Sequence, residues 1–206
     1  MHGATRRTAL LVALVVAALL GTALAAGAAA SHFGYHKVRE GLPSGLPHFS
    51  LTSSDVSPGQ PIPQQPFWGC DGTFESPQLS WSGAPGATQS YAVTVFDVDA
   101  PTGSGFWHWV AWDLPSSVTS LPTGAVLPAG AVNGENDGGG LGYTGPCPPA
   151  GDVMHHSHFT VVALDVPSLG LDPTTHAAVV GFQPRPARAR VRGVHRHGAA
   201  VARVIR

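Results

Sequence analysis

The sequence has few charged residues, and a long central stretch has no positive charge. Only 11% of the 206 residues are charged, and neither Lys nor Arg occurs between Gly41 and Pro184. The same stretch holds eleven of the twelve carboxylates. Because neutralising phosphates requires Lys or Arg, we expect this acidic body not to bind nucleic acid. An anion site in the body would have to use backbone N–H groups or protonated histidines.

Cysteine is also scarce, with only Cys70 and Cys147 in the chain. Two cysteines cannot form a tetrahedral zinc site without histidine ligands, and they are too few for a disulfide-framework miniprotein. The sequence has no H-E-x-x-H pattern, no P-loop and no G-x-S-x-G nucleophile elbow. No activated nucleophile lies beside a base in the sequence. We therefore expect no metal site, no cofactor and no enzymatic activity.

The first 30 residues are typical of an export signal. Arg6 and Arg7 precede an uncharged run from Thr8 to Ala30, and small residues offer a cleavage site before Ser31. The run is also long enough to span a bilayer, so an uncleaved N-terminal anchor is the alternative. Either way, we expect an exported protein that is secreted, periplasmic or held in the cell envelope.

Export would place both cysteines in an oxidising compartment, where a disulfide between Cys70 and Cys147 can form. The alternative is that both are buried thiols that act as small hydrophobic residues.

Composition divides the chain into four parts. Residues 1–30 are the signal peptide or anchor, 31–47 a flexible lead, 48–183 a folded domain, and 184–206 a basic tail. Seven of the ten arginines fall in the last 22 residues. We expect this tail to be extended and to lie outside the core of the domain. It could contact a membrane or an anionic envelope polymer, as could the N-terminal segment.

Within the domain, short strand-like runs alternate with turns rich in Gly and Pro. The runs rich in β-branched, aromatic and alternating apolar residues are Phe49–Ser53, Gln78–Ser82, Ser90–Phe96, Phe106–Leu114 and Phe159–Val166. This pattern favours an antiparallel β fold. One short helix is expected at Thr174–Phe182, with Asp172 as its N-cap and Pro173 in its first turn.

Several titratable residues lie near the ends of these strands. Asp97 and Asp99 follow one strand and would share a face if it continued; the alternative is that they only shape the turn. His108 lies in the aromatic strand and would share a face with Val110 and Trp112. It is either a hydrogen-bonded core residue or part of a site beside the carboxylates.

A further group of histidines, His155, His156 and His158, precedes the last strand. In an extended chain, His155 and His156 point to opposite faces, whereas His156 and His158 share one. No third metal ligand is evident from the sequence, so we do not expect this group to hold a metal.

Three segments in fixed order read SPQLSW from Ser76, DVDAPTGSGFWHWV from Asp97 and GYTGPCPPAGD from Gly142. They resemble the phosphatidylethanolamine-binding protein family, and in particular its bacterial Raf-kinase-inhibitor-like branch. The family patterns are S-P-x-L-x-W, D-P-D-A-P-x-G…W-H-W and G-Y-x-G-P-C-P-P-x-G-D. The resemblance covers about Phe49 to Phe182.

The resemblance implies a mostly β fold, in which a central antiparallel sheet is faced by a smaller sheet and flanked by few peripheral helices. It also implies a small anion-binding pocket at one end of the sheet. By motif position, the residues of that pocket are Asp97, His108, Cys147, Pro148, Pro149 and His155, with Tyr143 and Gly145 on its rim. The two histidines would donate to the anion, and backbone N–H groups near Cys147 would complete the site.

The sequence departs from the family patterns at three places. Val98 replaces a Pro, and His156 and Ser157 stand where the family has Arg and Tyr. The arginine-rich tail follows Phe182, where the family has a closing helix and strand. If those closing elements are absent, the pocket loses a wall and the core loses packing.

These observations predict an exported, non-enzymatic binding protein with a pocket for a small anion, such as phosphate or a phospholipid head group. The alternative is an inhibitor module of the Raf-kinase-inhibitor-like type that binds a protein partner.

Overall fold

The computed structural model describes residues 46–70, 74–182 and 199–205, all of which belong to the unit Val38–Arg206. The expected signal peptide or anchor, nearly all of the lead and most of the tail lie outside the described residues. The described elements are β1 (Ser50–Thr52), α2 (Gln64–Phe67), β2 (Leu79–Ser82), β3 (Ser90–Asp97), β4 (Phe106–Pro115), β5 (Ser120–Leu121), β6 (Val132–Asn133), β7 (Ser157–Leu164), α3 (Ala177–Phe182) and β8 (Ala199–Ile205). No helix among the described residues is long and apolar enough to span a bilayer.

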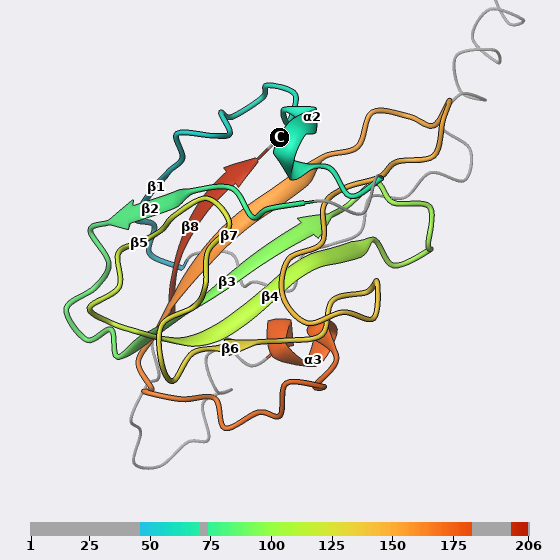
Figure 1. The fold of residues 1–206 in the computed structure, drawn as a ribbon. Helices are drawn as coiled ribbons and strands as arrows, with labels where there is room; N and C mark the ends of the chain where they lie inside the picture. Colours follow the sequence, from blue (N-terminus) through green and yellow to red (C-terminus); the bar gives the residue numbers. More distant parts are fainter. Residues whose placement is uncertain (1–45, 71–73, 183–198, 206) are drawn as a thin grey trace, which may run out of the picture. The chain divides into compact units, whose positions relative to one another are not determined.

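The strands form two antiparallel sheets. The larger has the order β6-β4-β3-β7-β8, and the smaller has the order β1-β2-β5. Figure 1 shows the long strands β3, β4 and β7 side by side, with β8 at one edge. The expected fold class, a central antiparallel sheet faced by a smaller one with few helices, is confirmed.

Both faces of the larger sheet are covered, because alternate residues of its strands point in opposite directions. On one face, Val93, Val95 and Phe159 pack with residues of the smaller sheet such as Leu79 and Trp81. On the other face, the buried residues of the sheet pack with two residues of α3; this cluster comprises Ala92, Val110, Trp112, Val162, Leu164, Ala177 and Val180. Burial on both faces explains why β3 and β7 are apolar along most of their length.

A register shift interrupts the pairing of β3 with β4 at His108. Val95 pairs with Trp109, but the next residue of β3, Phe96, pairs with Trp107. His108 is therefore an extra residue on β4, and the alternation of faces changes there. Trp109 packs on the side of the smaller sheet, whereas Trp107 packs on the side of α3. His108 was expected to share a face with Val110 and Trp112 on the basis of regular alternation, and this shift interrupts that alternation.

The end of the chain corrects the prediction of a separate tail. Residues Ala199–Ile205 form β8, which pairs antiparallel with β7 along its whole length, from Leu164 opposite Ala199 to His158 opposite Ile205. The closing strand is therefore present, as β8, whereas the segment after Phe182 in which a closing helix would lie is outside the described residues. Val201, Val204 and Ile205 are β-branched and suit a strand, but the Arg-rich composition around them favoured a separate tail.

The expected strands are confirmed within a few residues, but the helix near the C-terminal end is shorter than expected. It begins at Ala177 rather than Thr174. Asp172 instead closes a turn, in which its carboxylate accepts a hydrogen bond from the Thr174 N–H at 2.9 Å. The Asp-Pro signal therefore marks a turn that precedes the helix.

Candidate functional site

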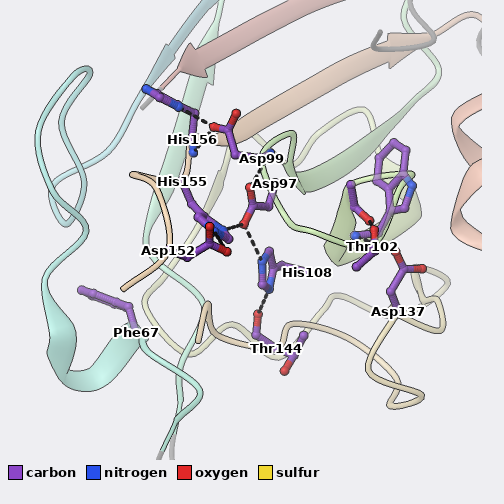
Figure 2. Close-up of polar contacts among 12 residues, drawn as sticks. Phe67, Asp97, Asp99, Thr102, His108, Asp137, Thr144, Asp152, His155 and His156 are labelled. Carbon is purple, nitrogen blue, oxygen red and sulfur yellow. Dashed lines mark hydrogen bonds and ion pairs between the residues drawn. The ribbon is translucent and has the colours of Figure 1, made fainter. Parts of the chain in front are cut away.

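The candidate site begins with Asp97, the last residue of β3. Its side chain is only 4% exposed, so its carboxylate needs partners that stabilise the charge. One oxygen, Oδ1, accepts a hydrogen bond from the Asp99 N–H at 2.9 Å. The other, Oδ2, accepts one from Nδ1 of His155 at 2.6 Å. Figure 2 shows Asp97 between His155 and His108.

His108 comes from the register shift on β4 and lies on the other side of this carboxylate. Its Nδ1 lies 3.1 Å from the carbonyl oxygen of Thr144. A carbonyl can only accept, so Nδ1 carries the proton and, in the neutral ring, Nε2 has a free lone pair. Nε2 is buried, lies 3.9 Å from Oδ2 of Asp97, and has no hydrogen-bond partner among the described residues. The ring also contacts Phe106, with centroids 4.8 Å apart.

His155 is held between two carboxylates. Its Nδ1 donates to Asp97, and its Nε2 lies 3.3 Å from Oδ2 of Asp152. Ionised carboxylates only accept hydrogen bonds, so both ring nitrogens carry protons in this arrangement and the ring is an imidazolium. The side chain of His155 is 8% exposed, whereas that of Asp152 is 25% exposed.

The electrostatics of Asp97 and His155 favour their charged forms. Burial acts to raise the pKa of Asp97, but the His108 ring when it carries a proton on Nε2, the Asp99 N–H and His155 together lower it below its ordinary value. Burial acts to lower the pKa of His155, but Asp97 and Asp152 raise it above its ordinary value. The two residues therefore form a buried ion pair near neutral pH.

A second Asp–His pair lies beside the first. Oδ2 of Asp99 accepts hydrogen bonds from the backbone N–H of His156, at 2.8 Å, and from its ring Nδ1. Figure 2 shows the two pairs side by side. Asp99 and His156 were not expected to pair, because they are 57 positions apart and only the pairing of β3 with β7 brings them together.

The Gly- and Pro-rich loop that supplies Thr144 is fixed to the segment after α2. Cys147 forms a disulfide with Cys70, 77 residues away, with Cα atoms 5.0 Å apart. The Gly69 N–H donates to the carbonyl of Pro146 at 3.0 Å. These contacts hold the loop against the domain and thereby fix the carbonyl that orients His108.

The predicted rim residues, Tyr143 and Gly145, contribute to the same attachment. The Tyr143 hydroxyl donates to the Phe67 carbonyl at 3.1 Å, and its ring packs edge-on against Trp109. Gly145 is buried so closely against Phe67 and Gly69 that a Cβ at this position would overlap their backbone atoms. Both residues therefore position the loop.

The structure thus brings together three of the predicted ligand-binding residues, Asp97, His108 and His155. The adjacent positions Cys147, Pro148 and Pro149 are exposed or half-buried. The idea that backbone N–H groups near Cys147 bind an anion finds little support, because the three prolines beside it carry no N–H. Asp152, Asp99, His156 and Thr144 were not among the predicted site residues.

Two other side chains lie at the margin of this cluster. The carboxylate of Asp137 accepts a hydrogen bond from the Trp107 N–H at 2.8 Å, which anchors the loop after β6 to the start of β4. The Thr102 hydroxyl donates to the Gly105 carbonyl and closes the turn between β3 and β4. Within the part of the chain that the structure describes, no group of three or more His, Cys, Asp or Glu side chains is arranged to hold a metal ion.

Comparisons with known proteins agree with this architecture. The family model described as "Phosphatidylethanolamine-binding protein" matches residues 52–193. YbcL of Escherichia coli is 44% identical over 143 residues, which cover 65% of this chain and 78% of YbcL. YbhB of the same organism is 38% identical over 162 residues, which cover 75% of this chain and 96% of YbhB.

Solved structures show the same relationship. The crystal structure of E. coli YbcL, described as a new member of the mammalian PEBP family, has a TM-score of 0.64 and 36% identity, and the match covers 77% of this chain and 97% of YbcL. A putative PEBP homolog from Chlamydia trachomatis has a TM-score of 0.61 and 30% identity, covering 77% and 95% of the two chains. The chain belongs to the phosphatidylethanolamine-binding protein family.

Proposed function

We propose that this protein is an exported, non-enzymatic binding protein that takes a small oxyanion, either free phosphate or the phosphate of a lipid head group, at the cluster of Asp97, His108 and His155. The observation that carries the proposal is the buried Nε2 of His108, which has no hydrogen-bond partner among the described residues. A buried polar atom of this kind needs an explanation, and a missing ligand is one.

The tautomer of His108 determines how an anion would bind. In the neutral ring, Nε2 offers a lone pair beside the Asp97 carboxylate, and a bare anion would be repelled. When the ring gains a proton, Nε2 becomes a donor that points into the same region as the His155 imidazolium. Two positive rings then outweigh the charge of Asp97, and the remaining positive charge, which the Asp152 carboxylate on His155 faces in the absence of a ligand, is available to an anion. Phosphate binding therefore includes the uptake of a proton by Nε2 of His108.

The composition of the body supports histidine as the source of positive charge, since no Lys or Arg occurs between Gly41 and Pro184. The hydrogen bonds of the His108 and His155 rings run to Thr144, Asp97 and Asp152, and none reaches a hydroxyl or thiol of the described residues. This arrangement supports a binding role over nucleophilic catalysis. The disulfide supports export to an oxidising compartment.

A protein-binding inhibitor role is the second candidate, and one observation favours it. Val153 and Met154 lie directly between Asp152 and His155, and they are 54% and 80% exposed. Exposed apolar residues next to a polar cluster are a feature of protein interfaces. A partner would then cover the same site from outside.

The test is a thermal-shift titration with phosphate and phosphoethanolamine at pH 5.5 and 7.5, in phosphate-free buffers, on the wild type and on His108→Ala. A ligand that binds only the native state raises the melting temperature. We expect a shift that is larger at pH 5.5 and absent in the variant. If the folded wild type shows no shift with either compound, anion binding is refuted and the protein-binding role becomes the leading candidate.

A further inference from the structure

Asp152 holds a place on His155 that an incoming anion would need. Resting on the function proposed above, we infer that the Asp152 carboxylate is a displaceable internal anion, which occupies Nε2 of His155 until a ligand oxyanion takes its place. It would act as a specificity-determining residue, because any ligand has to compete with a charge of the protein's own.

The two carboxylates that flank His155 are not equivalent. Oδ2 of Asp97 lies 2.6 Å from Nδ1 of His155, and the Asp97 side chain is 4% exposed. Oδ2 of Asp152 lies 3.3 Å from Nε2 of His155, and the Asp152 side chain is 25% exposed. The shorter, buried contact belongs to the framework, since Asp97 also accepts the Asp99 N–H. The longer contact at the surface is the weaker of the two, because water screens and competes for it. A ligand that reaches His155 therefore displaces Asp152 first.

The local backbone allows Asp152 to leave without disturbing the fold. Its hydrogen bonds are confined to neighbours in the sequence: its N–H donates to the Pro149 carbonyl, and its Oδ1 accepts from the Val153 N–H at 2.8 Å. Gly151 precedes it with φ of +84° and has open space around it. The carboxylate can thus turn away from His155 without breaking a contact between distant parts of the chain.

The charges around the site determine which ligands can displace Asp152. The carboxylates of Asp97, Asp99 and Asp152 face the rings of His108, His155 and His156. A displaced Asp152 stays close by, tethered to the same loop, and repels a ligand in proportion to the ligand's negative charge. The site therefore favours a singly charged oxyanion over a multiply charged one. Figure 2 shows Asp152 next to His155, on the side away from Asp99.

The test measures the affinity for inorganic phosphate and pyrophosphate at pH 6.0 by calorimetry in a phosphate-free buffer. Asp152→Asn removes the charge but keeps the shape of the side chain. Asp172→Asn is the matched control, because it makes the same change in net charge at an exposed aspartate whose carboxylate accepts hydrogen bonds from Thr174, far in the sequence from the site. We expect Asp152→Asn to bind phosphate roughly threefold to tenfold more tightly, with a larger gain for pyrophosphate. The control is expected to stay within about twofold of the wild type.

A second readout reports on His155 without relying on affinity. Asp152 contributes to the raised pKa of His155, so an NMR titration of the His155 ring in Asp152→Asn should show a lower pKa, and saturating phosphate should raise it again. This restoration would show that phosphate takes the place of the carboxylate on the ring.

The outcomes separate this inference from the proposed function. If neither the wild type nor the variant binds phosphate, the proposed function fails and the inference fails with it. If both bind phosphate equally, or the variant binds it more weakly, anion binding stands and the displacement of Asp152 by the ligand is refuted. Tighter binding by the variant, with an unchanged control, supports the displacement.

Discussion

The imidazole of His155 and the carboxylate of Asp97 form a buried pair, with Nδ1 2.6 Å from Oδ2. The pair connects the end of β3 to the loop that leads into β7, 58 residues later. It therefore contributes to the stability of the fold and also sets the charge of the candidate site.

The dependence of stability on pH follows from the pKa shifts of these two groups. The pKa of Asp97 lies below its ordinary value of 3.8, so its contribution is lost as the pH falls through that lowered value. The pKa of His155 lies above its ordinary value of 6.5, so its contribution is full below pH 6.5 and is lost as the pH rises through the raised value. We expect the pair to stabilise the protein most between these limits.

Melting temperatures of the wild type and of His155→Gln, measured from pH 3 to pH 9, test this expectation. The variant should be less stable by about 2 kcal/mol near pH 6, because a hydrogen bond between charged groups is lost. The difference should shrink above pH 6.5. If the difference in stability between the two proteins stays constant up to pH 9, the stabilisation by this pair does not depend on the charge of His155.

The strands could be predicted from the sequence because their side chains alternate or are apolar throughout, as in Ser90–Phe96. The grouping of Asp97, His108 and His155 came from the resemblance, since nothing local in the sequence joins residues separated by 58 positions. The register shift at His108 depends on how β3 pairs with β4, which no periodicity within one strand reveals. The strand Ala199–Ile205 was not predicted because it is short, its apolar residues do not alternate, and arginines lie close to it.

The disulfide should stabilise the domain substantially. Cys70 and Cys147 enclose a loop with a sequence separation of 77 residues. Replacing both cysteines by Ser should lower the free energy of unfolding by roughly 4 kcal/mol, because a long loop is released in the unfolded chain. Chemical denaturation of the double variant gives this value. Wild type measured with and without reductant is the control, and a change below about 1 kcal/mol would contradict the expectation.

The Gly- and Pro-rich loop that contains Thr144 contacts the segment after α2, and this contact can be tested at Gly145. A Cβ at this position would meet backbone atoms of Phe67 and Gly69, which cannot easily give way. Gly145→Ala should therefore destabilise the protein by about 2 kcal/mol or more. Gly86→Ala is the matched control, because a Cβ at Gly86 would have nothing within 4 Å and the φ of Gly86 lies outside the left-handed region. Equal melting temperatures for the two variants would show that the loop adjusts without strain.

On the function proposed above, anion binding takes up a proton at Nε2 of His108. The most direct measurement is calorimetric titration of phosphate at pH 7.5 in two phosphate-free buffers that differ in ionisation enthalpy, for the wild type and for His108→Asn. The Asn side chain can still donate to the Thr144 carbonyl but has no atom at the position of Nε2. We predict net uptake of about one proton by the wild type and a loss of at least tenfold in affinity in the variant. Binding without proton uptake, or equal affinity in the variant, would show that Nε2 of His108 does not take up a proton when the anion binds.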